Sequence, residues 1–126
     1  MLKITYLEEG IYLEYLEESI EAWKANRILV SLRAGINIFV ESSTACLVIP
    51  IDSRYLVDIA KLEAKQLIEV FPCDEEYLEV IVPGTWVSQS EDSEEGIFVC
   101  KLGLGDEYLL YSIWQESQVG SSLSID

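Results

Sequence analysis

The longest apolar-rich tract of the chain runs from Arg27 to Ile51 and reads RILVSLRAGINIFVESSTACLVIPI. Its first residues alternate with a period of two, which is typical of a β-strand. Gly35 interrupts the alternation, because glycine readily adopts the positive φ of a tight reversal. A second turn is expected at the hydroxyl-rich residues 42–44, and an apolar strand at residues 45–49 before Pro50. The tract therefore predicts a meander of three consecutive strands that carries most of the core.

Patterns on both sides of this tract predict further strands and two helices. Period-two alternation predicts an N-terminal hairpin and later strands, at residues 2–6, 11–16, 77–82 and 97–102. An apolar, β-branched run predicts a strand at residues 67–71. Pro83-Gly84 is expected to break the strand at 77–82, and residues 85–87 to form a short strand or its continuation. Apolar residues at helical spacing predict helices at about 53–65 and 106–116. Two structures are possible for residues 17–26: a short helix capped by Ser19, or an extended segment that leads into the strand expected from Arg27. The extended form is favoured.

These elements define the expected fold class. The helices do not alternate regularly with the strands, which disfavours a doubly wound parallel sheet. We expect a mainly β (α+β) protein, with a curved antiparallel sheet built as a half-barrel or a sandwich and two flanking helices. Residues 1–117 are expected to form a single globular domain, and residues 118–126 a flexible tail.

The composition indicates an ordinary folded protein of a reducing compartment. Half of the 126 residues are hydrophobic, yet no apolar run reaches the roughly 20 residues that span a bilayer. The first ten residues lack the pattern of a signal peptide. Three cysteines, Cys46, Cys73 and Cys100, are odd in number and far apart, as expected of free thiols rather than disulfides. We therefore expect a cytoplasmic location.

The net charge of −15 limits the possible partners. It disfavours binding to nucleic acids and to anionic membranes, both of which need a basic surface. The charge is also uneven, since nine acids and no basic residue lie between Lys65 and Lys101. A folded domain could therefore present one strongly negative face, which would suit a basic protein partner.

The sequence contains no pattern that assigns a catalytic, cofactor or metal residue. Histidine is absent, which removes histidine triads, bases and metal ligands. With 23 acids, two carboxylates must lie close by chance, so such a pair carries no signal. Two acidic segments, residues 74–76 and 91–95, lack the spacing of a calcium loop. Gly103-Leu104-Gly105 lacks the third glycine of a nucleotide loop.

Candidate interaction residues lie on both sides of the acidic segment SQSEDSEE, which we expect to be a mobile loop. Trp86 follows Pro-Gly and precedes this segment, so its ring is the best candidate for a partly exposed contact. The full set of candidates is Trp86, Tyr77, Glu91, Asp92, Glu94 and Glu95.

Four tracts carry a resemblance to a known family. They are VESSTACLVIPI from Val40, GTWVS from Gly84, EEGIFVCKL from Glu94 and YLLYSIWQESQ from Tyr108. Together they resemble a small family of acidic, uncharacterised proteins of cyanobacterial type, over most of the chain. The resemblance implies no activity and no functional residue.

Three functional hypotheses follow. The first is a non-catalytic interaction or regulatory module whose acidic face binds a basic protein. The alternative is a β-barrel-like carrier of a small ligand, with Trp86 and Tyr77 at the mouth of an apolar cavity. The third is an enzyme that uses two carboxylates in a cleft. A homodimer is compatible with all three, because edge strands of small sheets are often covered by a second copy.

Overall fold

The computed structural model describes residues 1–90, 92–103 and 105–120, with side chains up to residue 115. Six strands and three helices follow one another along this part of the chain. Their bounds are β1 (Leu2–Leu7), β2 (Gly10–Tyr15), α1 (Ile20–Ala34), β3 (Phe39–Pro50), α2 (Leu56–Ala64), β4 (Glu69–Pro72), β5 (Tyr77–Ser88), β6 (Gly96–Cys100) and α3 (Asp106–Gly120).

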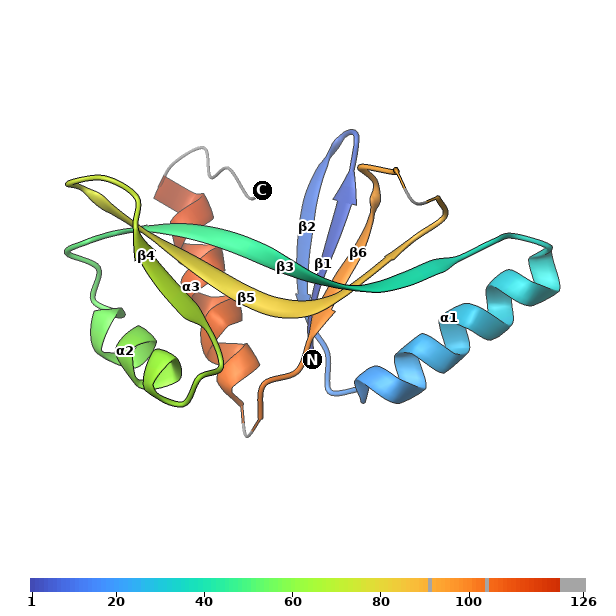
Figure 1. The fold of residues 1–126 in the computed structure, drawn as a ribbon, viewed down its shortest axis with the longest axis horizontal. Coiled ribbons are helices and arrows are strands. Elements are labelled where there is room, and N and C mark those ends of the chain that lie inside the picture. The colour runs from blue at the N-terminus through green and yellow to red at the C-terminus, as the bar shows by residue number, and fades with distance from the viewer. Residues whose placement is uncertain (91, 104, 121–126) are drawn as a thin grey trace.

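All six strands belong to one antiparallel sheet in the order β2-β1-β6-β5-β3, and β4 pairs with the first half of β5. β3 and β5 pair over twelve residues each, and Figure 1 shows them as a long twisted ribbon that the other strands cross. β5 therefore holds the sheet together, because it pairs with β3, β4 and β6. The predicted class, a mainly β fold with a curved antiparallel sheet, is confirmed. The sheet is open and does not close into a barrel.

The prediction of a strand at the start of the tract from Arg27 is wrong, because these residues belong to helix α1. The Ser19 side chain accepts a hydrogen bond from the Ala22 N–H at 3.1 Å and caps the helix. At the other end Gly35 has φ of 72°, and its N–H donates to the Leu32 carbonyl. The next N–H, of Ile36, donates to the Ser31 carbonyl, which completes a Schellman motif. The extended form favoured for residues 17–26 is therefore also wrong, because the helix capped by Ser19 begins at Ile20.

The turn predicted at residues 42–44 is also wrong. These residues lie inside β3, where Ser42 is paired with Thr85 and Thr44 with Pro83 of β5. Short hydroxyl side chains favour turns locally, but the ladder to β5 overrides that preference. The predicted three-strand meander is therefore a helix followed by one long strand.

The predicted break of a strand at Pro83-Gly84 does not occur, and the alternative, in which residues 85–87 continue the strand, is confirmed because β5 runs through both residues. Proline lacks an N–H, so it fits best where a strand has no neighbour on one side. β4 pairs with β5 only up to Ile81, and β6 pairs only from Thr85. Pro83 lies in the gap between these two neighbours.

The remaining predicted elements are confirmed. The N-terminal hairpin is β1–β2, and the helices predicted at about 53–65 and 106–116 are α2 and α3. The strands predicted after residue 66 are β4, the two halves of β5, and β6. α3 extends to Gly120, and residues 121–126 of the expected tail lie outside the described residues.

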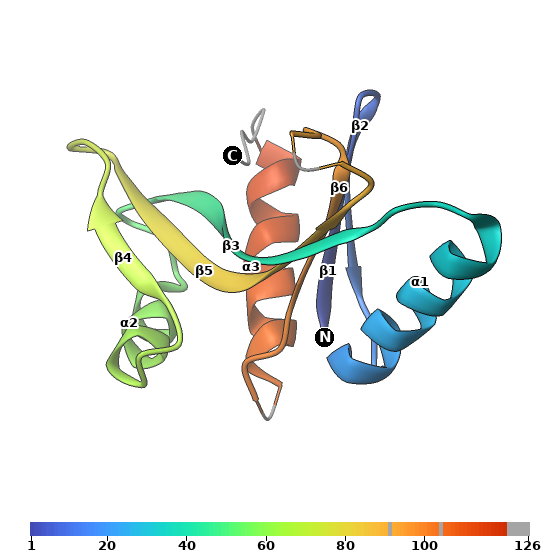
Figure 2. The same ribbon diagram turned by 45° about the vertical axis from the view of Figure 1, so that its right-hand side comes forward.

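Two hydrophobic cores lie on opposite faces of the sheet, because consecutive residues of a strand point to opposite sides. The larger contains Phe98 of β6 and is covered by α2 and α3, with Leu62 and Trp114 buried. The smaller contains Val99 of β6 and the first part of α1, through Trp23. Figure 2 shows α3 beside the middle of the sheet, with α2 and α1 at opposite ends of the molecule.

A substitution at Gly84 tests the close approach of β5 to β6. A Cβ atom there would lie 2.4 Å from the Phe98 ring and 2.5 Å from the Val99 carbonyl oxygen. Because both neighbours are fixed in the sheet, we expect Gly84→Ala to lower the free energy of unfolding by about 1–3 kcal/mol in urea titrations.

Gly35→Ala is the matched control, because a Cβ at Gly35 meets no atom within 4 Å. Its positive φ alone should cost about 1 kcal/mol. A Gly84→Ala protein as stable as the wild type would contradict the packing described for β5 and β6.

Candidate functional site

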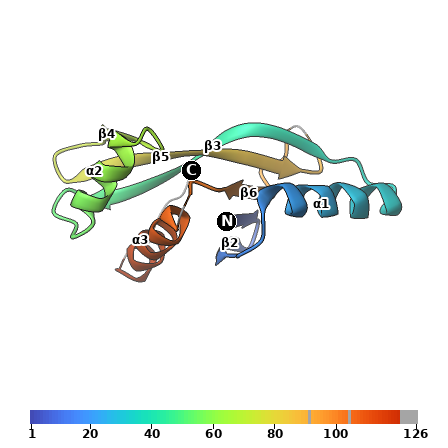
Figure 3. The same cartoon turned by 90° about the horizontal axis from the view of Figure 1, so that it is seen from below.

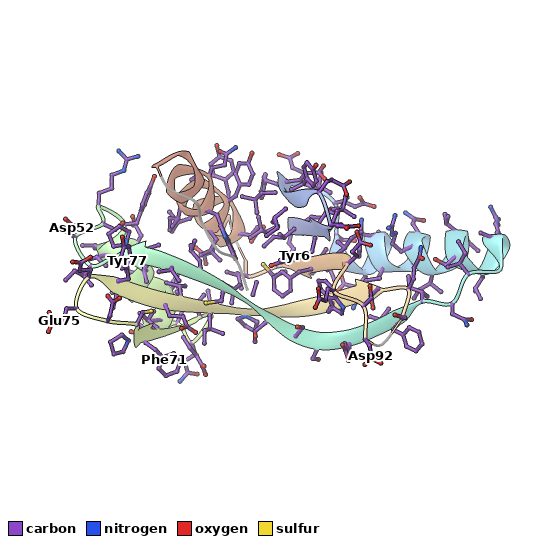
Figure 4. All side chains as sticks on the ribbon, turned by 90° about the horizontal axis from the view of Figure 1, so that it is seen from above. Tyr6, Asp52, Phe71, Glu75, Tyr77 and Asp92 are labelled. Atoms are coloured by element: carbon purple, nitrogen blue, oxygen red, sulfur yellow. The ribbon has the colours of Figure 1, made fainter. Side chains whose placement is uncertain are left out.

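The structure does not bring the sequence-predicted site residues together. Tyr77 begins β5 and Trp86 lies near its end, nine residues further along. At a rise of about 3.3 Å per residue, the strand between the two residues spans up to roughly 30 Å. Asp92, Glu94 and Glu95 follow β5, and Glu91 lies outside the described residues. In Figure 4, Tyr77 and Asp92 lie towards opposite ends of the β3–β5 ribbon.

Trp86 is packed against its neighbours. Its ring is half-buried at the border of the larger core and meets the Tyr6 ring edge-on, with ring centroids 5.5 Å apart. A Cβ added to Gly96 would lie 2.6 Å from the Trp86 ring, so the glycine makes room for the indole. The contacts of Trp86 are those of a packing residue.

Six of the described acids between Lys65 and Lys101 are divided between the two ends of β5. Asp92 and Glu94 are exposed at one end, where the Glu95 carboxylate accepts a 2.8 Å hydrogen bond from the Glu8 N–H. The exposed acids at residues 74–76 form the β4–β5 turn at the other end. Figure 4 shows Glu75 and Asp92 towards opposite ends of the long ribbon.

Two hollows lie near these ends, and both are open to solvent. One of about 370 Å³ lies beside Tyr77 and is rimmed by acids, including Asp52 and Glu76. The other, of about 280 Å³, separates α1 from the sheet and is lined by residues such as Arg27, Ser31 and Ile97. Neither is lined by Trp86. Their mixed lining differs from the enclosed apolar cavity that a carrier needs.

A buried carboxylate that the sequence analysis missed stands at the start of α3. Glu107 is only 2% exposed and accepts hydrogen bonds from the Leu102 and Gly103 N–H groups, both at 3.3 Å. Lys101 approaches it at 3.8 Å. Burial acts to raise the pKa of Glu107, but these backbone donors and its own N–H hold the pKa below its ordinary value. The carboxylate fixes the β6–α3 connection.

Cys100 lies in the same region and is buried in the larger core. Burial, followed by the nearby Glu107 charge, raises the pKa of the Cys100 thiol to about 12. The thiol is therefore protonated at neutral pH, which does not suit a nucleophile or a metal ligand.

Glu107→Gln tests the structural role of this carboxylate. The pKa is lowered in the folded state, so ionised Glu107 stabilises the fold above the unfolded pKa of about 4.3. This stabilisation disappears as the pH falls through the folded pKa. We expect the variant to lose about 1–3 kcal/mol at pH 7, and the loss to shrink below about pH 4.

Urea titrations across this pH range measure both effects. The control is Glu94→Gln, because Glu94 is exposed on the β5–β6 loop. If Glu107→Gln lowered the free energy of unfolding by the same amount at neutral and at acid pH, the ionised carboxylate would not be the stabilising group.

The largest unexplained feature is the apolar outer side of α1. Four of the fourteen large hydrophobic side chains that are exposed in the described structure lie on α1, namely Ile28, Leu29, Val30 and Leu32, and three more follow the helix between Ile36 and Val40. Leu32 is 70% exposed and Leu29 is 46% exposed. Figure 3 shows no other element over α1 on the side seen from below. Such an apolar concentration typically marks an interaction surface.

The exposed residues follow the spacing of a helix–helix contact. We define the α1 seam as four exposed apolar residues of the helix that are three and four positions apart, Ala22, Ala25, Leu29 and Leu32, together with exposed Ile36 just beyond the Gly35 cap. Alternating steps of three and four keep side chains on one side of a helix and are the repeat of coiled-coil interfaces. Trp23, Arg27 and Ser31 point the other way, towards the body.

The attachment of α1 to the body is confined to its first turns. Trp23 is the only buried residue of the helix, and the smaller core also contacts Ile20. Further along, the 280 Å³ groove lies between the helix and the sheet, and Arg27 and Ser31 line it. Most of α1 therefore gains little from contact with its own chain.

The charge of α1 differs from that of the rest of the molecule. Three basic residues, Lys24, Arg27 and Arg33, stand against the single acid Glu21, which gives the helix a charge of +2. Because the whole chain carries −15, the remaining residues carry −17. The exposed apolar surface thus coincides with a basic segment of an acidic protein.

The sequence held a signal for this surface. The three-four spacing from Ala22 to Ile36 could have been found, but two of its members are alanines, which weaken an apolar pattern. That the seam faces away from the core could not have been read from the sequence.

Other site types find no support among the described residues. No group of three or more Asp, Glu, Cys or His side chains in that part of the chain is placed to hold a metal ion. None of the helices, as far as residues 1–90, 92–103 and 105–120 define them, is both long enough and apolar enough to cross a membrane.

Comparison with known proteins identifies the family. The family model described as Alr0857-like matches residues 1–118, so the chain belongs to the Alr0857-like family. Neither the curated proteins nor the solved structures contain a significant match.

Proposed function

We propose that this chain, a member of the Alr0857-like family, is a non-catalytic interaction module that binds another protein through the α1 seam. The observation that supports the proposal is the exposure of Leu29 and Leu32 on a helix that only its first turns attach to the body. Full burial of such a side chain contributes roughly 1.5–3 kcal/mol, so a partner that covers the seam gains affinity from both leucines.

The acids contribute to the same function through charge. Basic groups on a partner are attracted by the −17 body, and the charge of the exposed loop at Asp92 and Glu94 raises the rate of association. Helix α1 carries Glu21 in its first turn and Arg33 in its last turn, so its two ends favour groups of opposite charge at the contact itself. A suitable partner therefore combines an apolar stripe with both signs of charge.

A carrier or an enzyme has less support. The two hollows are open and partly acidic, and neither lies beside Trp86. The buried carboxylate, Glu107, has a lowered pKa, whereas a general acid needs a raised one.

Stability measurements test whether the seam side chains contribute to the free energy of unfolding of the single chain. We expect Leu32→Glu to change the free energy of unfolding by less than about 0.5 kcal/mol, because Leu32 is an exposed side chain. Trp23→Ala should lose about 3–5 kcal/mol, because Trp23 anchors α1 in the smaller core. A strongly destabilised Leu32→Glu protein would show that the seam packs within the chain.

A photo-crosslinking residue, placed at position 32 in the native cells, tests binding itself. We expect it to yield one discrete adduct with another polypeptide. The control is position 30, which is also exposed on α1 but lies outside the seam. The absence of any adduct at position 32, or equal adducts at both positions, would contradict the proposal.

A further inference from the structure

We propose that the polypeptide bound by the α1 seam is a second copy of this chain, and that the two α1 helices pack antiparallel. The inference rests on the proposed function and names its partner. Three features of α1 support it: the sizes of the seam residues, the distribution of charge along the helix, and the position of the helix at one end of the molecule.

The seam residues complement one another in size when two copies run antiparallel. In one register, Ala25 of each copy faces Leu29 of the other, and Ala22 faces Leu32. Each layer then holds one small and one large side chain, which lets two helices approach closely without voids. All four side chains are exposed in the single chain, so pairing needs no rearrangement of the core.

The charges along α1 are also self-complementary in this direction. Exposed Glu21 lies in the first turn of the helix and exposed Glu17 shortly before its Ser19 cap, whereas Arg33 lies in its last turn. Antiparallel pairing brings the basic end of each helix to the acidic end of the other and aligns their dipoles favourably. Parallel pairing would place like charges together.

Antiparallel pairing also keeps the acidic bodies apart. α1 lies at one end of the molecule, beyond β1, β2 and β6 (Figures 1 and 2). A two-fold axis across the middle of the helices puts one body at each end of the pair, so the two −17 regions are not in contact. The contact itself is made by the +2 segments, whose ends attract each other.

The length of the contact sets the expected strength. Fifteen residues of helix span about 22 Å, so the seam alone forms an interface at the small end of stable complexes. We therefore expect a reversible dimer with a dissociation constant in the micromolar range.

Sedimentation velocity on the purified chain, over a hundredfold range of concentration, measures this equilibrium. We expect the wild type to pass from monomer to dimer, and Leu32→Glu to weaken the dimer at least tenfold. Val30→Glu adds the same charge at an equally exposed position outside the seam and should leave the equilibrium within about threefold of the wild type. A wild type that stays monomeric throughout the range would overturn the inference.

A charge exchange tests the direction of pairing. Arg33→Glu should weaken an antiparallel dimer, and adding Glu21→Lys to it should restore most of the affinity at low salt. In a parallel dimer residue 33 faces residue 33, so neither change would have this effect. A double variant no stronger than Arg33→Glu alone would overturn the antiparallel arrangement.

The mass of the crosslinked adduct separates this inference from the proposed function. An adduct at position 32 with twice the mass of the chain supports a second copy. An adduct of another mass, together with a monomeric purified protein, overturns the second copy but leaves the seam as a binding surface. No adduct at all overturns both.

Discussion

The pairing of β5 with three other strands is the constraint on which the structure depends. β5 pairs with β3 along its whole length, and with β4 and β6 along different halves of its other edge. Gly84 allows β6 to approach β5 closely, because the missing side chain leaves room for the Phe98 ring. The larger core is built on the face of β5 that carries Val80 and Val82.

The length of this ribbon explains the exposure of α1. β3 begins opposite the last residue of β5, so the helix before it lies at the far end of the ribbon. Of the helix residues, Trp23 is buried in the smaller core and Ile20 packs against it. A helix with so few contacts to its own chain has little local stability. A bound partner therefore orders such a helix more than it orders a well-packed one.

Much of the fold could be predicted from the sequence, because local patterns and burial agree there. The N-terminal hairpin alternates, and α2 buries Ile59 and Leu62 at helical spacing. α1 could not be predicted in this way, because Ile28, Val30 and Leu32 imitate a strand alternation. Periodicity assumes that apolar residues face the core, and the outer side of α1 violates that assumption.

The candidate site was harder to predict than the fold, for a related reason. Trp86 and Tyr77 are aromatic residues near acids, but the sequence does not reveal that most of one long strand, β5, separates them. Glu107 is one of 23 acids, and only the β6–α3 connection shows that it is buried. Patterns identify which residues are apolar or charged, whereas tertiary structure decides which of them are covered.

Hydrogen exchange of the α1 amides at low and high protein concentration tests the central claim most directly. If a second copy covers the α1 seam, protection of residues 25–34 rises with concentration, while protection of the β5 and β6 amides stays constant. Equal protection of α1 at both concentrations would contradict the account.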